Sequence, residues 1–234
     1  MTTYTSEYAQ SEFEQHGELW LQQKLENKLN TIFDVGSNIG EWTRMARKYN
    51  PNAEIHTFEV MAPTYRKMLS NIVIDDKIYP NGFGLGDENG PITVRYKPEY
   101  DAVSTSILNL RLDDSLIKTG LVMKGDDYVA SREIDKIDFL KVDTEGAEER
   151  VFKGFEHCLR QGRIKMIQFE YGYICVLTKW LLKDSYEYLT QFGYSLGKLT
   201  PTGIQFHDYA LYHEDFQGPD YVAVHNYYRE ELGL

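Results

Sequence analysis

Residues 34–40 combine an acid with two glycines and form a candidate ligand-binding loop. Asp34, Gly36 and Gly40 give the spacing D-x-G-x-x-x-G, directly after a short apolar run and before a helical pattern. Glycines at such a turn let a ligand approach the backbone closely, and the helix N-terminus presents unpaired N–H groups. The spacing differs from the G-x-G-x-x-G of dinucleotide-binding proteins. An acid at the strand end would repel a pyrophosphate, but it suits a cationic amino-acid group.

A second acid, Glu59, ends the next predicted strand, 19 residues after Gly40. A carboxylate at this position can accept two hydrogen bonds from a ribose diol. The loop and Glu59 together indicate a ligand that joins a nucleoside to an amino acid, and S-adenosylmethionine is such a ligand. The alternative interpretation is a tight strand–helix turn followed by a surface glutamate.

A third group of chemically active side chains follows a later apolar strand. Lys141 lies inside that strand on the same face as Asp143, and a buried ammonium without a partner is costly. Glu170 ends the predicted neighbouring strand. We expect Lys141, Asp143, Glu145 and Glu170 to form a polar cluster around the reacting atoms, with a purely structural ion network as the alternative. Spacing does not identify which carboxylate is the base, and Glu148 is expected to cap the following helix.

The sequence resembles the FkbM family of class I S-adenosylmethionine-dependent methyltransferases. The similar segments are FDVGSNIG at 33–40, FEV at 58–60 with Pro63, LKVDTEGAE at 140–148 with Val151 and Gly154, and IQFE at 167–170. They lie within residues 30–172, and the K-x-D-x-E-G-x-E block is the most specific of them. The resemblance implies an O-methyltransferase acting on a hydroxyl of a sugar, a polysaccharide precursor or a small natural product.

The resemblance also implies which residues hold S-adenosylmethionine, whose product is S-adenosylhomocysteine. Glu59 would contact the ribose, and Asp143 would contact the cofactor in addition to its part in catalysis. The residues implied for the methionine part are Asp34, Gly36, Ser37, Asn38, Gly40 and Thr43, and those implied for the adenine are Val60, Gly86 and Asp87.

Attack by an alkyl hydroxyl needs a base or a metal to take its proton. We expect no metal site, because Lys141 can supply positive charge; a divalent metal is the less favoured alternative. A looser cluster could in principle bind a metal, although a solvated acidic loop is the favoured interpretation. That cluster consists of His207, Asp208, His213 and Glu214. Tyrosines close to these segments in the sequence could shape an acceptor pocket, and they are Tyr171, Tyr173, Tyr209 and Tyr212.

Strands and helices must alternate to position these groups, and through the first two thirds of the chain they do. This alternation predicts right-handed βαβ units. The expected fold is α/β: a doubly wound, mostly parallel, Rossmann-like seven-stranded sheet with an antiparallel C-terminal edge and helices on both faces. The predicted strands are 31–35, 55–58, 78–85, 92–96 (as its hairpin partner), 137–142, 164–170, 194–199 and 221–225. The predicted helices are 6–30 with a break near Gly17, 38–49, 62–72, 146–160 and 178–191.

The expected organisation is an N-terminal helical extension at 1–30 and a methyltransferase domain at 31–234, with 97–120 as an insertion or lid-like loop. The 234 residues carry a net charge of −11, which disfavours binding to nucleic acid. The chain shows no run of about 18 apolar residues and no apolar leader in 1–23, so we expect no membrane segment and a cytoplasmic location. Cys158 and Cys175 form no disulfide framework.

Other classes of function fit parts of the pattern. A nucleoside-cofactor-binding module without catalysis would bind the same ligand but would not turn over. A methyltransferase acting on a non-hydroxyl acceptor would use the same loop. The missing G-x-G-x-x-G and the retained Asp34 argue against an NAD-linked enzyme. The acceptor is expected to be a small molecule or a carbohydrate, and nothing in the sequence indicates the oligomeric state.

Overall fold

The computed structural model describes residues 11–97, 104–105, 115–218 and 220–234. The first ten residues of the expected extension and most of the expected 97–120 insertion therefore lie outside the described residues. The helices are α2 (Glu18–Lys24), α3 (Glu41–Tyr49), α4 (Ala62–Asn71), α5 (Gly125–Ser131), α6 (Glu148–Gly154), α7 (Glu156–Arg160), α8 (Ile174–Thr178), α9 (Leu182–Thr190), α10 (Arg229–Leu232) and the 3-10 turns η1 (Leu211–His213) and η2 (Asn226–Tyr228). The strands are β1 (Thr31–Val35), β2 (Glu54–Phe58), β3 (Ile78–Asn81), β4 (Gly84–Gly86), β5 (Gly90–Tyr96), β6 (Ser104–Thr105), β7 (Leu116–Lys124), β8 (Ile137–Val142), β9 (Ile164–Glu170), β10 (Tyr194–Thr200), β11 (Gly203–Phe206) and β12 (Asp220–His225).

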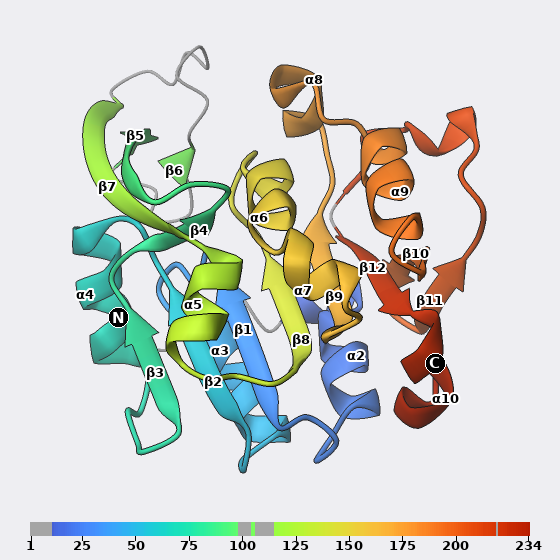
Figure 1. Cartoon of the computed structure of the whole chain (residues 1–234), viewed down its shortest axis with the longest axis horizontal. Helices are drawn as coiled ribbons and strands as arrows, with labels where there is room; N and C mark the ends of the chain where they lie inside the picture. Colours follow the sequence, from blue (N-terminus) through green and yellow to red (C-terminus); the bar gives the residue numbers. More distant parts are fainter. Residues whose placement is uncertain (1–10, 98–103, 106–114, 219) are drawn as a thin grey trace.

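The main sheet has the strand order β11-β10-β12-β9-β8-β1-β2-β3 (Figure 1). Its strands run parallel from β3 to β9, and β12 pairs antiparallel with both β9 and β10. The expected doubly wound α/β fold with an antiparallel edge is confirmed. The sheet has one strand more than the seven expected, because β11 folds back on β10 as a hairpin.

The strand order reverses between β1 and β8, since the chain continues from β1 outward to β2 and from β8 outward to β9. Loops leaving the two strands diverge to opposite sides there, which opens a crevice at their carboxyl ends. The glycine loop follows β1 and the acidic block follows β8, so both candidate motifs lie at this crevice.

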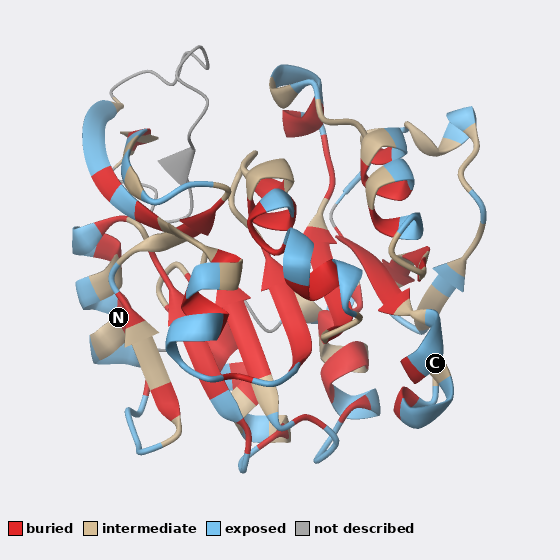
Figure 2. Ribbon diagram, in the orientation of Figure 1, coloured by how far each residue is buried: buried red, intermediate tan, exposed pale blue. Residues whose placement is uncertain are grey.

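Helices cover both faces of the main sheet, and Figure 2 shows its central strands buried along their length. Alternate residues of a strand point to opposite faces. Phe33 and Val35 accordingly pack with α5, α6, α7 and α9, while Ile32 packs with α2, α3, α4 and α10. Two apolar layers hold the strands in place, and Asp34, Lys141 and Gln168, which share the face of Ile32, interrupt the second layer.

A second sheet has the order β4-β7-β5-β6 and stands above the carboxyl ends of β1 and β2 in Figure 1. The predicted continuous strand 78–85 is wrong, because it divides between the two sheets at Gly82 and Phe83. The predicted hairpin partner is also wrong: β5 pairs antiparallel with β7, and β4 pairs parallel with β7. The partner residues of β5 on β7 lie at least 20 positions further along the chain, beyond an interval in which the sequence shows little periodicity.

Two predicted helices also differ from those observed. The 146–160 helix is divided into α6 and α7 at Phe155, whose backbone leaves the helical region with φ −106° and ψ 18°. The 178–191 helix begins at Leu182, after the separate short helix α8. The break expected near Gly17 is confirmed: residues 11–16 are helical and α2 begins at Glu18. None of the helices in the described part of the chain has the length and apolar composition needed to cross a bilayer.

Candidate active site

Strand register places the polar residues of three adjacent strands side by side. Asp34 on β1 is opposite Lys141 on β8, and Lys141 is opposite Gln168 on β9. Nearer the strand ends, Glu170 on β9 is opposite Asp220 on β12. The sheet therefore presents a polar surface on the face that α2 and α3 cover, at the crevice edge.

A cavity of about 300 Å³ lies along this edge. One end is at Glu59 and Val60, after β2, and the other is at Lys141, Asp143 and Glu145, after β8. The remaining lining residues are Glu12, Phe13, Val35, Gly36, Ser37, Asn38, Ile39, Glu41, Trp42, Phe58, Gly84, Leu85, Ile92, Val94, Val122, Thr144 and Ala147. The glycine loop, the second acid and the acidic block thus share one cavity.

The glycine loop is fixed between the ends of β2 and β8. Gly36 has φ +83°, and a Cβ there would lie 1.8 Å from the carbonyl oxygen of Asp143. The N–H groups of Gly36 and Ser37 both donate to the carbonyl of Phe58, at 3.0 Å. Asn38 has φ 47° and Gly40 has φ 86°. Glycine is therefore required at 36 by a backbone approach within the protein as well as by dihedral angle.

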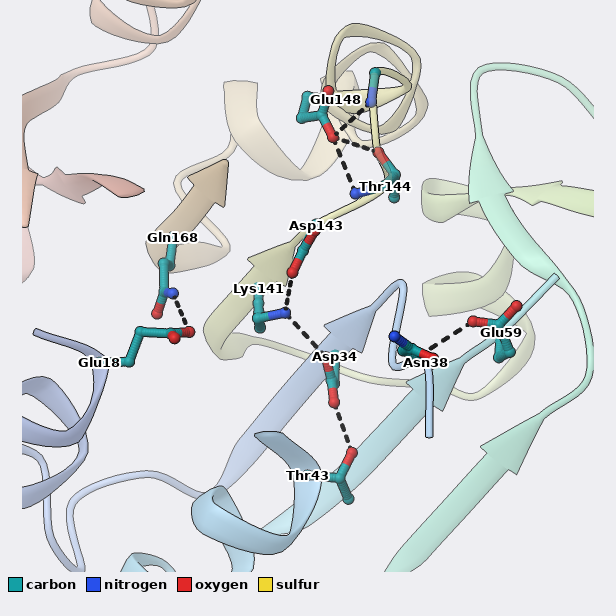
Figure 3. A network of polar contacts seen from close by, with 11 residues as sticks. Glu18, Asp34, Asn38, Thr43, Glu59, Lys141, Asp143, Thr144, Glu148 and Gln168 are labelled. Carbon is teal, nitrogen blue, oxygen red and sulfur yellow. Dashed lines mark hydrogen bonds and ion pairs between the residues drawn. The ribbon is translucent and has the colours of Figure 1, made fainter. Parts of the chain in front are cut away.

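Glu59 lies in the cavity wall directly after β2 and is 6% exposed. One carboxylate oxygen accepts from the N–H of Met61 at 2.7 Å, and the other accepts from the N–H of Asn38 at 3.1 Å (Figure 3). Burial raises the pKa of Glu59 to about 7. Each oxygen keeps a second lone pair, so the carboxylate can hold the loop and still accept a ligand hydroxyl.

Asp34 and Thr43 lie beneath the cavity rather than in its wall. Thr43 Oγ1 donates to Asp34 Oδ2 at 2.6 Å, and Lys141 Nζ lies 4.0 Å from Asp34 Oδ1. Asp34 is fully buried, which raises the pKa of its carboxyl. The direct effect of Asp34 is on Lys141, which it helps to anchor.

Lys141 is the cation at the centre of Figure 3. Its Nζ donates to Asp143 Oδ2 at 2.9 Å and lies 5.7 Å from the centre of the Trp42 ring. Burial lowers the pKa of Lys141, but the carboxylates of Asp143 and Asp34 outweigh burial and raise it above its ordinary value. The ammonium is therefore charged at neutral pH, and it faces the cavity.

Three carboxylates meet beside Lys141. One oxygen from each of Asp143, Glu145 and Glu170 lies within 4.8 Å of the other two, a separation that shared protons or a cation could bridge. Burial, followed by the charges of Asp143 and Glu148, raises the pKa of Glu145 to about 8. Burial and the charge of Asp143 raise the pKa of Glu170 to about 10. The raised pKa values reduce the negative charge that Glu145 and Glu170 carry at neutral pH.

The backbone also singles out Glu145. It has φ 52°, a left-handed conformation that is uncommon for a residue with a side chain. Glu148 braces this turn: one of its oxygens accepts from the N–H and Oγ1 of Thr144 and from the N–H of Gly146. The turn holds Glu145 in the cavity wall, while Glu148 lies in the first turn of α6, where its charge favours the helix dipole, and bonds to the preceding turn.

Several residues that the sequence predicted for the site do not line the cavity. Asp87 lies at the surface, where it pairs with Arg150 at 2.7 Å. Gly86 and Glu170 are likewise absent from the cavity lining. Tyr171 is buried, whereas Tyr173 and Tyr212 are largely exposed.

The looser histidine cluster is a set of ring and hydrogen-bond contacts. His207 and His213 have ring centroids 3.8 Å apart, Tyr186 bonds to His207, and Tyr209 bonds to Glu214. Among the described residues, the three side chains close enough to ligate one metal ion are Asp143, Glu145 and Glu170. His207 and His213 have no third ligand of this kind in the described part of the chain.

Sequence reasoning missed side chains that come from distant segments. Glu18 of α2 accepts from Gln168 Nε2 at 2.7 Å, and both side chains are buried (Figure 3). Asp220, at the start of β12, joins them electrostatically. The second sheet contributes the apolar wall through Ile92, Val94 and Val122. The signals available were an acid within the predicted helix 6–30, Glu18, and an acid directly before the predicted strand 221–225, Asp220.

The strand order, with a cavity where it reverses, defines a Rossmann-like α/β domain. The family model described as "Methyltransferase FkbM domain" matches residues 34–196, and the chain belongs to this family. The chain is 27% identical over 147 residues to the hexuronic acid methyltransferase AglP of Haloferax volcanii, a match covering 61% of this chain and 57% of that protein.

Two solved structures are similar to the chain at low sequence identity and with TM-scores below 0.5. The METTL16 MTase domain has a TM-score of 0.48 and 11% identity, covering 89% of this chain and 65% of that chain. Precorrin-6y C5,15-methyltransferase from Geobacter metallireducens has a TM-score of 0.45 and 11% identity, covering 88% of this chain and 86% of that chain.

Proposed function

We propose that this protein is an S-adenosylmethionine-dependent O-methyltransferase acting on a hydroxyl of a sugar, a polysaccharide precursor or a small natural product. The observation that carries the proposal is the single cavity that joins Glu59 and the glycine loop to Lys141, Asp143 and Glu145. Membership of the FkbM family supports methyl transfer, and the sugar-acid substrate in the name of the relative AglP supports a carbohydrate-type acceptor.

The cavity wall offers groups that fit the cofactor. Glu59 has lone pairs for the ribose, and Val60 with Leu85 gives an apolar surface for the adenine. The indole N–H of Trp42 is buried without a hydrogen-bond partner among the described residues, so it can donate to the methionine carboxylate. We assign Asp143 to the ammonium group of the methionine part. Lys141 Nζ donates to the Asp143 carboxylate and so holds Asp143 in place.

When bound, S-adenosylmethionine supplies an electrophilic methyl group on a sulfonium. The acceptor oxygen forms a bond to the methyl carbon, and the breaking carbon–sulfur bond leaves its electron pair on a neutral sulfur. A side chain must take the hydroxyl proton, and we assign this role to Glu145. It lines the cavity, and its pKa of about 8 is close to a working pH. Asp143 is paired with Lys141, and Glu170 lies outside the cavity wall.

No metal is part of this proposal, because the Lys141 ammonium can stabilise the oxygen as it loses its proton. We expect EDTA to leave turnover unchanged and added Mg²⁺ not to raise it. Complete loss of turnover in EDTA, restored by Mg²⁺, would instead place a cation among the three carboxylates.

Cofactor binding tests the proposal directly. Glu59→Ala should weaken S-adenosylmethionine at least about tenfold, since hydrogen bonds to a charged acceptor contribute about 1.5–3 kcal/mol each. Glu54→Ala, at the exposed start of the same strand, is the matched control. Calorimetry would measure both, and an unchanged affinity for Glu59→Ala would remove this residue from the site.

Turnover separates the proposal from its alternatives. A binding module without catalysis would bind S-adenosylmethionine and release no S-adenosylhomocysteine with any acceptor. An NAD-linked enzyme would show a larger thermal shift with NAD than with S-adenosylmethionine. Analysis of the product would show whether the methyl group is on oxygen.

A further inference from the structure

The cavity at the strand ends has room for the cofactor and for little else. Pockets that hold drug-sized molecules have volumes of about 300–1,000 Å³, and this cavity is about 300 Å³. S-adenosylmethionine, a nucleoside joined to an amino acid, is a molecule of that size. Most of the acceptor must therefore bind outside the cavity, with its hydroxyl at the opening.

The acceptor hydroxyl must reach Glu145, to which we assign the role of base. This end of the cavity reaches solvent, because the Asp143 side chain is 42% exposed and Thr144 and Glu145 are half-buried. The rest of the acceptor must then lie on the protein surface that adjoins Asp143 and Glu145.

Helix α8 adjoins this end of the cavity. The chain enters α8 shortly after Glu170, one oxygen of which lies within 4.8 Å of oxygens of Asp143 and Glu145. Burial raises the pKa of the Cys175 thiol, within α8, to about 11, and the charges of Glu148 and Glu170 add to the shift. The inner face of α8 therefore lies near both of these acids, and its outer face continues the surface beside the acidic block.

The outer face of α8 is apolar. Residues 171–178, YGYICVLT, include no charged side chain, in a chain of which 26% is charged. Tyr173, Val176 and Leu177 are 72%, 53% and 44% exposed, and Figure 2 shows the outer turn of α8 in pale blue. A surface helix normally presents polar residues to solvent. These three side chains form the α8 patch, which is apolar where a surface helix is normally polar.

The size of the α8 patch suits a single alkyl chain rather than a protein. A stable protein–protein interface takes about 20–30 residues from each partner. The α8 patch has three side chains, at a helix of five residues. Apolar surface beside a ligand site is typical of a binding groove or an interaction surface. A flexible chain can bury apolar area on so small a surface, whereas a second protein needs a much wider one.

We propose, resting on the proposed function, that the methyl acceptor is amphipathic and that its alkyl chain binds the α8 patch. The polar part of the acceptor carries the hydroxyl and lies at Asp143 and Glu145, and the alkyl chain extends from it along Tyr173, Val176 and Leu177. Binding removes apolar area of the chain and of the patch from water, so the patch adds affinity for this class of acceptor. A wholly polar sugar would leave the α8 patch exposed.

Two probes that differ only in their alkyl group test this proposal: methyl β-D-glucopyranoside, and octyl β-D-glucopyranoside kept below its micelle-forming concentration. Ligand-observed NMR measures the binding of each to the protein loaded with S-adenosylhomocysteine. We expect the octyl glycoside to bind at least about tenfold more tightly, a ratio that burial of about two methylene groups provides. The double variant Val176→Ser, Leu177→Ser should lower this ratio at least about threefold. The control is Val73→Ser, Ile74→Ser, which removes an adjacent exposed aliphatic pair before the start of β3 and should keep the wild-type ratio.

Equal binding of the two glycosides, no measurable binding of the octyl glycoside, or a ratio that Val176→Ser, Leu177→Ser leaves unchanged would overturn the proposal. Light scattering that shows a wild-type dimer and a monomeric double variant would also overturn it, because the α8 patch would then bind a second copy. Failure of the proposed function is a separate result, namely absence of S-adenosylmethionine binding by calorimetry. The glycoside ratio is measured on the unliganded protein in that case.

Discussion

At the scale of single residues, the site places chemically similar carboxylates in different surroundings. Asp143 is held by Lys141 at 2.9 Å, while Glu145 is held by a strained turn and has its pKa raised to about 8. The first arrangement gives the carboxylate a cationic partner, and the second gives a carboxyl that gains and loses its proton near neutral pH. This difference supports the roles proposed above, positioning for Asp143 and proton transfer for Glu145.

Glu145→Gln therefore tests chemistry with little change in architecture. The amide has the same shape and cannot take a proton, so we expect turnover per folded molecule to fall about 10²–10⁴-fold. Cofactor affinity and melting temperature should stay near the wild-type values. Turnover that matches wild type would move the base away from Glu145.

Asp143→Asn should give a mixed result, because it removes the main partner of Lys141. Breaking a buried ion pair costs about 3–5 kcal/mol, but 42% of the Asp143 side chain is exposed and solvent screens the pair. We therefore expect a loss of about 1–2 kcal/mol, or about 2–8 °C in melting temperature, together with weaker cofactor binding. A melting temperature equal to that of Glu145→Gln would argue that Asp34 alone holds Lys141.

At the scale of elements, the glycine loop links the ends of three strands. Gly36→Ala adds a Cβ within 1.8 Å of the Asp143 carbonyl at a positive φ, so the loop or the end of β8 must move. We expect a loss of at least about 3 kcal/mol, which lowers the melting temperature by about 6–12 °C. Gly172→Ala is the control, because a Cβ there would meet nothing within 4 Å. Similar melting of the two variants would contradict this account of the loop.

The same scale shows what the sequence could and could not predict. The strands of the main sheet were predictable because β1, β2, β8 and β9 are short apolar runs bounded by turn residues. The second sheet was not, since β4 pairs with β7 across an interval with little periodicity. Pairing of distant segments depends on tertiary packing, which local propensity does not encode.

The residues of the candidate site also differ in whether the sequence could predict that they meet. Glu59, the glycine loop and the block from Lys141 to Glu148 lie at or directly after strand ends, so their meeting at one edge follows from parallel topology. Glu18 and Asp220 reach the same place from the N-terminal helix and the antiparallel edge, and no spacing rule connects them to β8. The adenine prediction at Gly86 and Asp87 depended on where the third strand ended. That strand stops at Asn81, so the cavity wall is formed by Gly84 and Leu85 instead.

At the scale of the whole molecule, the buried acids connect the site to stability. Burial raises the pKa values of Glu18 and Glu59 to about 7 and, with neighbouring charge, those of Glu145 to about 8 and Glu170 to about 10. Their ordinary value is 4.5, so the folded protein holds protons that the unfolded chain has released at neutral pH. The raised pKa of Lys141 adds stability that is constant below 10.5, its ordinary value, and so does not vary in the neutral range.

The stability of the cofactor-free protein should therefore fall as pH rises from 5 to 9. Unfolding free energy decreases with pH wherever the folded state binds more protons than the unfolded state. These carboxyls contribute fully below about pH 4.5, and the contribution is lost as pH passes through their folded-state pKa values. Glu170→Gln mimics the protonated form, so its melting temperature should fall less steeply between pH 7 and 9 than that of wild type. Glu54→Gln, at an exposed position, should keep the wild-type slope. Melting temperatures measured by calorimetry that are flat or rising from pH 5 to 9 would show that the acids are ionised in the folded protein, and that their charge is balanced in another way.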